Sequence, residues 1–509
     1  MDMDKAKVRI TGYGKLQELY SLDVLPHYCV SYIALKGERK TVVEPLLTTE
    51  IYPLRYDPGD SPGALIEFAL KYEGINLEIL YSIFQKMEEK EICNHVLASP
   101  LGIYTRKIWF LYEFLTGREL AIPDLKQGNY ADLLDSSSYY PAVPIRNRRH
   151  RINNNITGDR RFCPVVRKTD ILEKYSSMQF EKQCGDMLEK YPPELLSRTL
   201  AYLYTKETKS SFEMENVIPE KQRTARFIAL LRRAGKEKIL NKEALVKLQK
   251  AIVDERFALD DYRDFQNYVG ESIGLEKEIV HYVPPRPDDI AEMMDGMIYC
   301  AENMLESKMH PVITAAVASF GFVLLHPFED GNGRLHRFLI HHILSKTGFT
   351  PENLIFPVSA TMLKQIARYD EVLESFSKPL MEHVEYTLNS EGEMKVLNQT
   401  GVHYRYIDMT FFAERLFEFV RDTIEKELKG ELDFIIWYDE LLKSLREIVD
   451  MPDRKIDLFI KLCIQNKGRI ASGKRKIFEK LTDSEISHME KTIQKHMKEG
   501  KVDFPQLRK

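Results

Sequence analysis

Residues 326–337, HPFEDGNGRLHR, combine side chains and backbone freedom suited to binding a phosphate group and moving a proton. The unperturbed pKa of His326 lies near neutrality, so this residue is suited to act as a general base. Gly331, Asn332 and Gly333 tolerate unusual backbone angles and leave amide groups open to approach. The spacing of the residues that follow predicts a helix beginning near Gly333. The free amides and the dipole at the start of that helix would form an anion site.

Three charged side chains complete this predicted site. Arg334 and Arg337 are three residues apart, so they should project from one face of the helix, above the anion site. Asp330 supplies a hard oxygen ligand, which suits a Mg²⁺ ion shared with phosphate oxygens. A base, a cradle for a polyphosphate and a metal ligand together predict phosphoryl or nucleotidyl transfer.

A long apolar helix must position the histidine. The run from Val312 to Leu325 is almost entirely apolar, which predicts a helix buried on nearly all sides with His326 at its end. Pro327 and Phe328 should end this helix, and Phe328 should anchor the turn in the core. A lone histidine after an apolar helix is usually structural, but the partners at the right offsets favour catalysis here.

The same twelve residues match the signature of the Fic family. Its pattern, H-P-F-x-[DE]-G-N-G-R-x-x-R, is satisfied at every constrained position of residues 326–337. The segment FQNYVG…HYVPPRPDDIAEMM also resembles the flap and the following helix of that family. The resemblance covers residues 225–385 well and the first 165 residues only loosely.

The resemblance implies an enzyme that transfers AMP from ATP to a hydroxyl side chain of a target protein, on Tyr, Thr or Ser. The histidine would deprotonate the hydroxyl, which attacks the α-phosphate, and the flap would hold the target by strand addition. A related kinase branch has lysine after the asparagine, so Gly333 favours adenylyl over phosphoryl transfer. The implied roles are those of a base, a Mg²⁺ ligand and a group of phosphate-binding residues: His326; Asp330; and Gly331, Asn332, Gly333, Arg334 and Arg337.

A second family motif, [ST]-x-x-x-E-[GN], occurs ahead of the site as SFEMEN, from Ser211 to Asn216. In the family this motif lies on a helix outside the catalytic core, which we expect here near residues 207–220. The resemblance implies that Glu215 pairs with Arg337 and removes the charge that the γ-phosphate needs. In some Fic proteins the same glutamate is implied in the removal of AMP, and the sequence leaves open which direction dominates.

Length and patterning predict a mainly α-helical protein of three parts. The 509 residues exceed what one hydrophobic core usually holds. Residues 1–165 mix β-branched runs with helical patterns, which predicts an N-terminal α+β module. The pattern of residues 166–385 predicts a helical region with a β-hairpin at 268–287. The resemblance implies that this is the Fic catalytic region, with its core at about 240–385 and the hairpin as its flap. Residues 386–509 predict a short hairpin followed by a mainly helical C-terminal region.

Composition narrows the class of protein. The 44% hydrophobic and 29% charged residues are typical of a globular chain, and a net charge of −4 says little about partners. The sequence starts without the basic-then-apolar order of a signal peptide, and no apolar run reaches the roughly 18 residues of a membrane span. The six cysteines show no C-x-x-C spacing. We therefore expect a cytoplasmic protein without a membrane partner; self-modification and a homodimer stay open.

Two segments keep other functions open. The arginine-rich PIRNRRHRINNNITGDRRF, residues 144–162, predicts a loop or linker. Its arginines could grip a polyanion, but pairing with nearby acids is favoured because no aromatic residues interleave with them. Residues 456–481 resemble a helix-turn-helix, although plain packing is commoner for such a segment. The alternatives are thus a non-catalytic nucleotide-regulated interaction protein or DNA-binding protein, or an enzyme that transfers another nucleotide.

Overall fold

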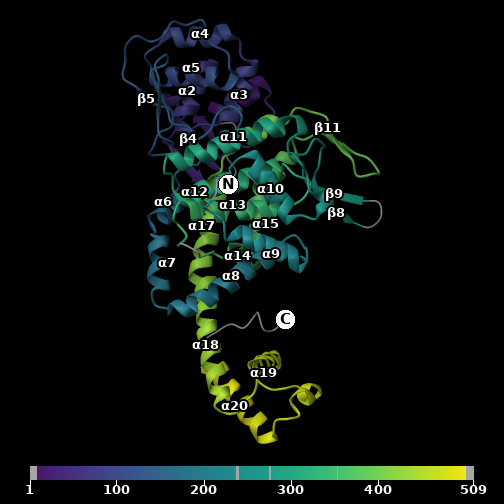
Figure 1. Cartoon of the computed structure of the whole chain (residues 1–509). Helices are drawn as coiled ribbons and strands as arrows, with labels where there is room; N and C mark the ends of the chain where they lie inside the picture. Colours follow the sequence, from purple (N-terminus) through teal and green to yellow (C-terminus); the bar gives the residue numbers. More distant parts are fainter. Residues whose placement is uncertain (1–7, 237–239, 274–276, 352–353, 500–509) are drawn as a thin grey trace. The chain divides into compact units, whose positions relative to one another are not determined.

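The computed structural model describes residues 8–236, 240–273, 277–351 and 354–499, and the fold is mainly α-helical with small β-sheets, as predicted (Figure 1). The chain divides into two compact units. Unit 1 comprises Met1–Met178, Glu220–Thr347 and Gln365–Phe417, and unit 2 comprises Gln179–Pro219, Gly348–Lys364 and Glu418–Lys509. Both units are discontinuous, and their boundaries cut across the three-part division of the sequence. No helix in the described ranges combines the length and apolar character needed to cross a bilayer.

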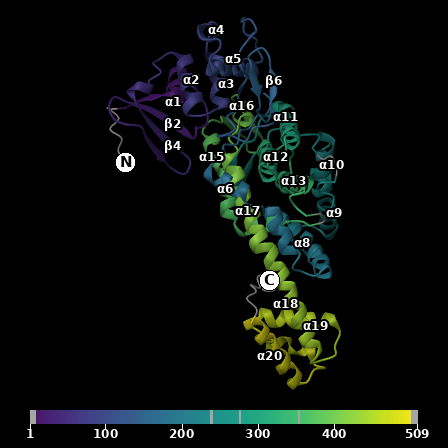
Figure 2. The same cartoon turned by 90° about the vertical axis from the view of Figure 1, so that its left-hand side faces the viewer.

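The N-terminal part of unit 1 contains both strands and helices. Its first elements are β1 (Val8–Thr11), α1 (Gly12–Tyr20), β2 (Cys29–Ala34), β3 (Lys40–Val43), β4 (Thr48–Pro53), α2 (Pro62–Tyr72), α3 (Leu77–Lys86), α4 (Glu89–Ala98), α5 (Ile103–Thr116) and α6 (Asp170–Ser177). The sheet order is β1-β2-β4-β3, with β2 antiparallel to β1 and parallel to β4. Helix α1 packs against β2 and α2 (Figure 2). The α+β character expected of this region is therefore present.

The arginine-rich segment is not a linker. It contains β6 (Ile145–Asn147) and β7 (Ile152–Asn154), which pair antiparallel and join β5 (Ala131–Asp132) in a sheet of order β5-β7-β6. The prediction of a loop or linker was wrong because strands of three residues are too short to show an alternating pattern. The side chain of Ile152 is fully buried and ties β7 to the core.

The rest of unit 1 is built around one buried helix. Its elements are α9 (Lys221–Leu231), α10 (Lys242–Ile252), β8 (Val269–Ile273), β9 (Lys277–Tyr282), α11 (Pro287–Glu306), α12 (Pro311–Leu325), α13 (Asn332–Lys346), α15 (Ile366–Met381), β10 (Tyr386–Leu388), β11 (Met394–Val396), α16 (Gly401–Arg405) and α17 (Thr410–Asp422), whose last residues belong to unit 2. Helix α12 packs against both α11 and α13. Every residue from Val312 to Leu325 is buried, as predicted from their apolar character. The predicted flap is the hairpin of β8 and β9.

The N-terminal region and the helices around α12 belong to the same compact unit. Residues 162 and 163 connect them. The backbone amide of Cys163 donates a hydrogen bond of 2.7 Å to the carbonyl of Arg405. The ring of Phe162 fills the space beside Gly321 in α12, where an added Cβ would lie 2.9 Å from the ring. A side chain at Gly321 would therefore push this contact apart.

Unit 2 is helical. It contains α7 (Phe180–Leu188), α8 (Pro193–Glu213), α14 (Val358–Lys364), the π-helix η4 (Thr423–Leu428), α18 (Lys429–Arg446), α19 (Asp453–Gln465), the 3₁₀ helix η5 (Ser472–Phe478) and α20 (Asp483–Glu499). The helix-turn-helix candidate thus forms part of α19 followed by a 3₁₀ helix. The Phe478 and Phe459 rings meet edge to face, 5.0 Å apart, within an apolar cluster. This part of the segment packs into the apolar cluster of unit 2, which is the alternative that the sequence analysis favoured.

Candidate active site

The end of α12 presents His326 in a strained conformation. Helix α12 begins where the His310 side chain accepts a hydrogen bond of 3.2 Å from the amide of Val312. It ends at His326, whose φ of 50° and ψ of 57° are left-handed. Its amide donates to the carbonyl of Phe322 over 3.0 Å and closes the last turn. A left-handed conformation costs a residue other than glycine about 1 kcal/mol, and such strain concentrates at functional sites.

The loop after His326 is held in shape by Asn332. The Oδ1 atom of Asn332 accepts from the amide of Phe328 at 3.1 Å, and its Nδ2 donates to the Phe328 carbonyl at 2.7 Å. The Phe328 side chain is fully buried, as predicted, and its ring lies near that of Tyr262. Asn332 is 2% exposed, so its amide is committed to the loop in this structure.

Helix α13 begins at Asn332, one residue from the predicted start. Gly331 precedes it with a φ of 91°, a conformation that favours glycine, and provides no side chain to cap the helix. An added Cβ at Gly331 would lie 2.8 Å from Cγ1 of Val253. Glycine therefore fits this position for both reasons, and the first amides of α13 are available to an anion.

The two arginines of the motif are both buried. Arg334 is 1% exposed and donates through Nη1 to the carbonyl of Ile252 at 2.9 Å. Its Nη2 forms an ion pair with Asp330, four residues earlier. Arg337 is 3% exposed. Arg334 therefore points toward α10 and Asp330 rather than standing free above the helix start, so phosphate binding by this residue would require an exchange of partners.

His326 has the protonation state that a general base needs. Its Nδ1 lies 3.2 Å from the carbonyl oxygen of Val323, which favours the tautomer with the proton on Nδ1. Burial, and then the positive charge of Arg263, lower the pKa of His326 to about 4. At neutral pH the ring is therefore uncharged, and Nε2 carries a lone pair that can accept a proton.

Arg263 is a site residue that the sequence analysis missed. It is 3% exposed, and burial lowers its pKa to about 10, so it stays charged at neutral pH. Its Nε donates to the His326 carbonyl at 2.9 Å, and its backbone amide donates to the Pro327 carbonyl at 2.9 Å. Its Nη1 and Nη2 donate to the carbonyls of Phe265 and Pro285. One side chain thus joins the histidine to both ends of the flap.

The flap is also tied to the loop by its own side chains. The Tyr282 hydroxyl donates to the carbonyl of Leu324, and Nδ2 of Asn267 donates to the carbonyl of Phe328 at 3.1 Å. Residues 274–276 of the predicted flap lie outside the described residues. The base of the hairpin is thus fixed next to His326.

The comparisons with known proteins point to one family. The Fic/DOC family matches residues 239–344, which include α10, the flap, α11, α12 and the motif from His326 to Arg337. Residues 239–344 are a Fic domain.

The curated relatives of this chain resemble it over a short stretch. "Protein adenylyltransferase Fic" of Drosophila virilis is 36% identical over 91 residues, which are 18% of this chain and 17% of that protein. The protein of the same name from Drosophila ananassae is 37% identical over 91 residues, which are 18% of this chain and 16% of that protein. The chain thus matches about a sixth of the length of these relatives.

Solved structures give a wider but weaker likeness. A Fic family protein from Desulfovibrio desulfuricans covers 52% of this chain and 76% of its own, at 18% identity and a TM-score of 0.37. A Fic domain containing signaling protein from Bacteroides thetaiotaomicron covers 50% of this chain and 96% of its own, at 16% identity and a TM-score of 0.36.

Asp330 is chemically suited to a Mg²⁺ ion bound together with phosphate. One carboxylate oxygen accepts from the Gly331 amide at 2.6 Å and pairs with Arg334. The side chain is 41% exposed, so its second oxygen can be reached from solvent. Mg²⁺ is commonly held by one or two carboxylates, with the remaining ligands supplied by substrate phosphates and water. Clusters of three or more metal-binding side chains do not occur among the described residues.

The motif SFEMEN lies outside the Fic domain, in unit 2. Helix α8 ends at Glu213, so the helix expected at 207–220 ends earlier than predicted. The Val217 amide donates to the Phe212 carbonyl at 3.1 Å, and the Asn216 amide donates to the Glu213 carbonyl at 3.0 Å. This pattern is a Schellman motif, in which Glu215 lies between the C-cap residue Met214 and the left-handed Asn216.

The left-handed residue of that motif explains one position of the pattern. Asn216 has a φ of 55°, a conformation that glycine and asparagine adopt most readily, which fits the [GN] position. The buried Ser211 lies in the last turn of α8. The helix end therefore fixes where the backbone of Glu215 stands within unit 2.

Proposed function

We propose that this chain is a protein adenylyltransferase, which transfers AMP from ATP to a Tyr, Thr or Ser hydroxyl of a target protein. The observation that carries the proposal is the uncharged His326, fixed through Nδ1 on the Val323 carbonyl and followed by an uncapped helix start at Gly331. A base beside an anion site suits the attack of a hydroxyl on a phosphate. The names of the relatives that match the Fic domain support the same activity.

In the proposed reaction, Nε2 of His326 takes the proton of the target hydroxyl as its oxygen attacks the α-phosphorus. The new O–P bond forms as the bond between the α-phosphorus and the bridging oxygen breaks, and pyrophosphate leaves. The amides of Asn332 and Gly333 bind phosphate oxygens, and the Gly331 amide, which donates to Asp330 in this structure, joins them when that carboxylate turns to the metal. Asp330 would hold Mg²⁺, whose charge neutralises phosphate oxygens when it is bound.

The two arginines would bind the β- and γ-phosphates. Arg334 is engaged by Asp330 in this structure, so binding ATP with Mg²⁺ would let the carboxylate turn to the metal and the guanidinium turn to phosphate. Such an exchange replaces one charged partner of each group with another, which limits the cost of breaking the pair. The flap would hold the target segment by strand addition. Self-modification, a homodimer and a cytoplasmic location also belong to the proposal.

Labelled ATP tests the reaction. Wild-type protein with Mg²⁺ should transfer label from the α-phosphate to protein, and His326→Ala should lower this transfer by about 10²- to 10⁴-fold. His488→Ala, at an exposed position of α20, is the matched control and should keep full transfer. Label from the γ-phosphate would show phosphoryl transfer instead, and preference for another NTP would show a different nucleotide. Equal label in wild type and His326→Ala would contradict the proposal.

The second part of the proposal is inhibition by Glu215. Its carboxylate would pair with Arg337 and leave the γ-phosphate without its partner, so that ATP binds unproductively. The place of Glu215 in the turn after α8 supports this role, because the backbone hydrogen bonds of that turn hold its position. The same carboxylate could orient water for removal of AMP.

Paired variants of the α8 terminus test the inhibition. Glu215→Gly removes the proposed pairing with Arg337. It should raise AMP transfer about tenfold for each 1.4 kcal/mol by which this pairing favours the inhibited state. Glu213→Gly removes a neighbouring exposed carboxylate from the same turn and should leave AMP transfer near the wild-type level. A Glu215→Gly protein that transfers AMP no faster than wild type would remove inhibition from the proposal. Release of AMP from a modified target, if lost in Glu215→Gly, would reveal the reverse activity.

A further inference from the structure

A cavity of about 390 Å³ lies in the N-terminal part of unit 1, outside the Fic domain. It is bounded by the C-terminal end of α2, by α5, by the loop after β5 and by residues just before α6. Its lining falls within residues 28–168. The volume is within the range of roughly 300–1,000 Å³ that is usual for small-molecule sites.

The charge of the lining is strongly positive. Lys71, Lys107 and Lys168 line the cavity, and no described carboxylate forms an ion pair with any of the three. Burial lowers the pKa of Lys107, which shows that its ammonium group is poorly solvated. The acidic residue of the lining, Asp135, accepts two hydrogen bonds of 2.8 Å from the amide and hydroxyl of Ser137. Asp135 attracts Lys107 and Lys168, and Asp132 also attracts Lys107, so an anion in the cavity would add to the negative charge that these two carboxylates supply.

The other end of the cavity is aromatic. The hydroxyl oxygens of Tyr28 and Tyr139 meet beside Gly74, where an added Cβ would lie 2.4 Å from both. Gly74 has a φ of 87°, so a larger residue would be strained there as well. The Arg167 guanidinium lies 3.6 Å from the centre of the Tyr28 ring and donates through Nε to Asp408 at 2.8 Å. Arg167 therefore covers one face of the Tyr28 ring, and these contacts fix this end of the cavity.

We propose that this cavity binds a small ligand that carries both a phosphate group and a planar ring, as a nucleoside monophosphate does. Lysine ammonium groups bind phosphate as point charges, and the lysines here approach from three different segments of the lining. Tyrosine faces stack on planar rings, and the partly exposed Tyr104 lines the cavity. Phosphate alone would leave this ring without a ligand contact. The inference needs the N-terminal part of unit 1 and does not depend on AMP transfer.

Lysine acetylation of the full chain tests the proposal at the cavity itself. The protein is acetylated with and without AMP, adenosine or inorganic phosphate, and mass spectrometry measures the modification of each lysine. AMP should reduce acetylation of Lys71, Lys107 and Lys168 several-fold, inorganic phosphate should reduce it less, and adenosine should leave it unchanged. Lys90, exposed on α4, is the internal control and should react equally in every sample.

A variant pair then separates this site from the Fic domain. Calorimetric titration with AMP should lose one binding event in Lys107→Met relative to wild type, whereas Lys90→Met should keep it. Thermal unfolding should show Lys107→Met to be folded, because the substitution removes a half-buried charge that has no ion-pair partner. Acetylation of the three lysines that is unchanged by all three compounds would overturn the proposal. Protection by inorganic phosphate as strong as that by AMP would overturn the requirement for a planar ring.

Discussion

Residues 146–161 and residues 326–337 share residue types, since the first contains six arginines and the second two, each together with glycine, asparagine and histidine, yet the two segments have different roles. In the first segment, Arg149 donates through Nη2 to Glu113 at 2.9 Å and through Nη1 to Asp124 at 2.6 Å. Arg161 pairs with Asp159 at 2.6 Å. These arginines form ion pairs and hydrogen bonds within the fold. In the second segment the backbone around His326 is held, while Nε2 of His326 is left for the substrate.

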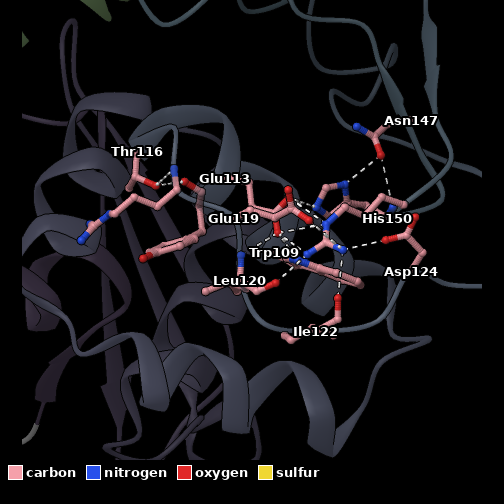
Figure 3. A network of polar contacts seen from close by, with 12 residues as sticks. Trp109, Glu113, Thr116, Glu119, Leu120, Ile122, Asp124, Asn147 and His150 are labelled. Atoms are coloured by element: carbon pink, nitrogen blue, oxygen red, sulfur yellow. Dashed lines mark hydrogen bonds and ion pairs between the residues drawn. The ribbon is translucent and has the colours of Figure 1, made fainter.

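The two histidines show the difference most directly. The buried His150 has Nδ1 2.8 Å from Oδ1 of Asn147 and Nε2 2.9 Å from Oε2 of Glu113, so both ring nitrogens have partners (Figure 3). His326 has Nδ1 near the Val323 carbonyl, whereas its Nε2 contacts no donor or acceptor among the described residues. A structural histidine uses both nitrogens within the fold, and a catalytic one keeps a nitrogen for the substrate. Composition alone cannot separate these cases.

Among the variants considered, Arg263→Met should have the largest effect on stability and on AMP transfer, because it removes the side chain that holds the backbone at His326. The carbonyls of His326, Phe265 and Pro285 would lose their donor, which should cost about 3 kcal/mol of unfolding free energy. AMP transfer should fall at least about tenfold, since a small misplacement of the base is costly. Urea unfolding and the kcat of AMP transfer measure the two effects.

The pH profile distinguishes a positioning role from a loss of fold. The charge of Arg263 is the second cause of the lowered pKa of His326, after burial. In Arg263→Met the acid limb of kcat/KM, which reports the free enzyme, should therefore move to higher pH. Arg263→Lys keeps the charge without the forked guanidinium and should leave the limb nearly in place while recovering part of kcat. An Arg263→Met protein with wild-type stability and kcat would contradict the positioning role of Arg263.

Glu113→Gln should have the next largest effect and should act on stability alone. Burial raises the pKa of Glu113, but hydrogen bonds from His150 and Arg149 outweigh this and lower it to about 2. In the unfolded chain a glutamate titrates near about 4.3, so the stabilisation is complete above about pH 5 and is lost as the pH falls toward 2. We expect Glu113→Gln to cost about 2 kcal/mol at pH 7 and progressively less below pH 5.

Urea unfolding between pH 7 and pH 3 measures this cost. Glu119→Gln is the matched control, because Glu119 lies 3.4 Å from Arg149 but is 74% exposed, and it should change little at any pH. AMP transfer per folded molecule should be unchanged in both variants. If the loss of unfolding free energy in Glu113→Gln does not decrease at low pH, the charge of Glu113 does not stabilise the network.

The sequence predicted those parts of the site whose signal is local. The apolar run of α12, the start of α13 and the flap all follow from periodicity or from residues close in sequence. Arg263 escaped because its carbonyl partner at His326 is 63 residues away and a lone arginine has no pattern. The pairing of Arg334 with Asp330 escaped because helical spacing fixes the direction of a side chain but not its partner. The end of α8 was misplaced because a Schellman turn depends on one left-handed residue, Asn216.

Arg148→Ala should have the smallest effect and gives the sharpest test of the first segment. Arg148 is exposed between β6 and β7, so its removal should change the unfolding free energy by less than about 0.5 kcal/mol. If the segment binds only the protein itself, duplex DNA should bind wild type and Arg148→Ala equally weakly in gel-shift titrations. If it grips a polyanion, this arginine is free to contact phosphate, and its loss should lower both the affinity and its salt dependence. That second outcome would make the two arginine-bearing segments alike in function as well as in residue types.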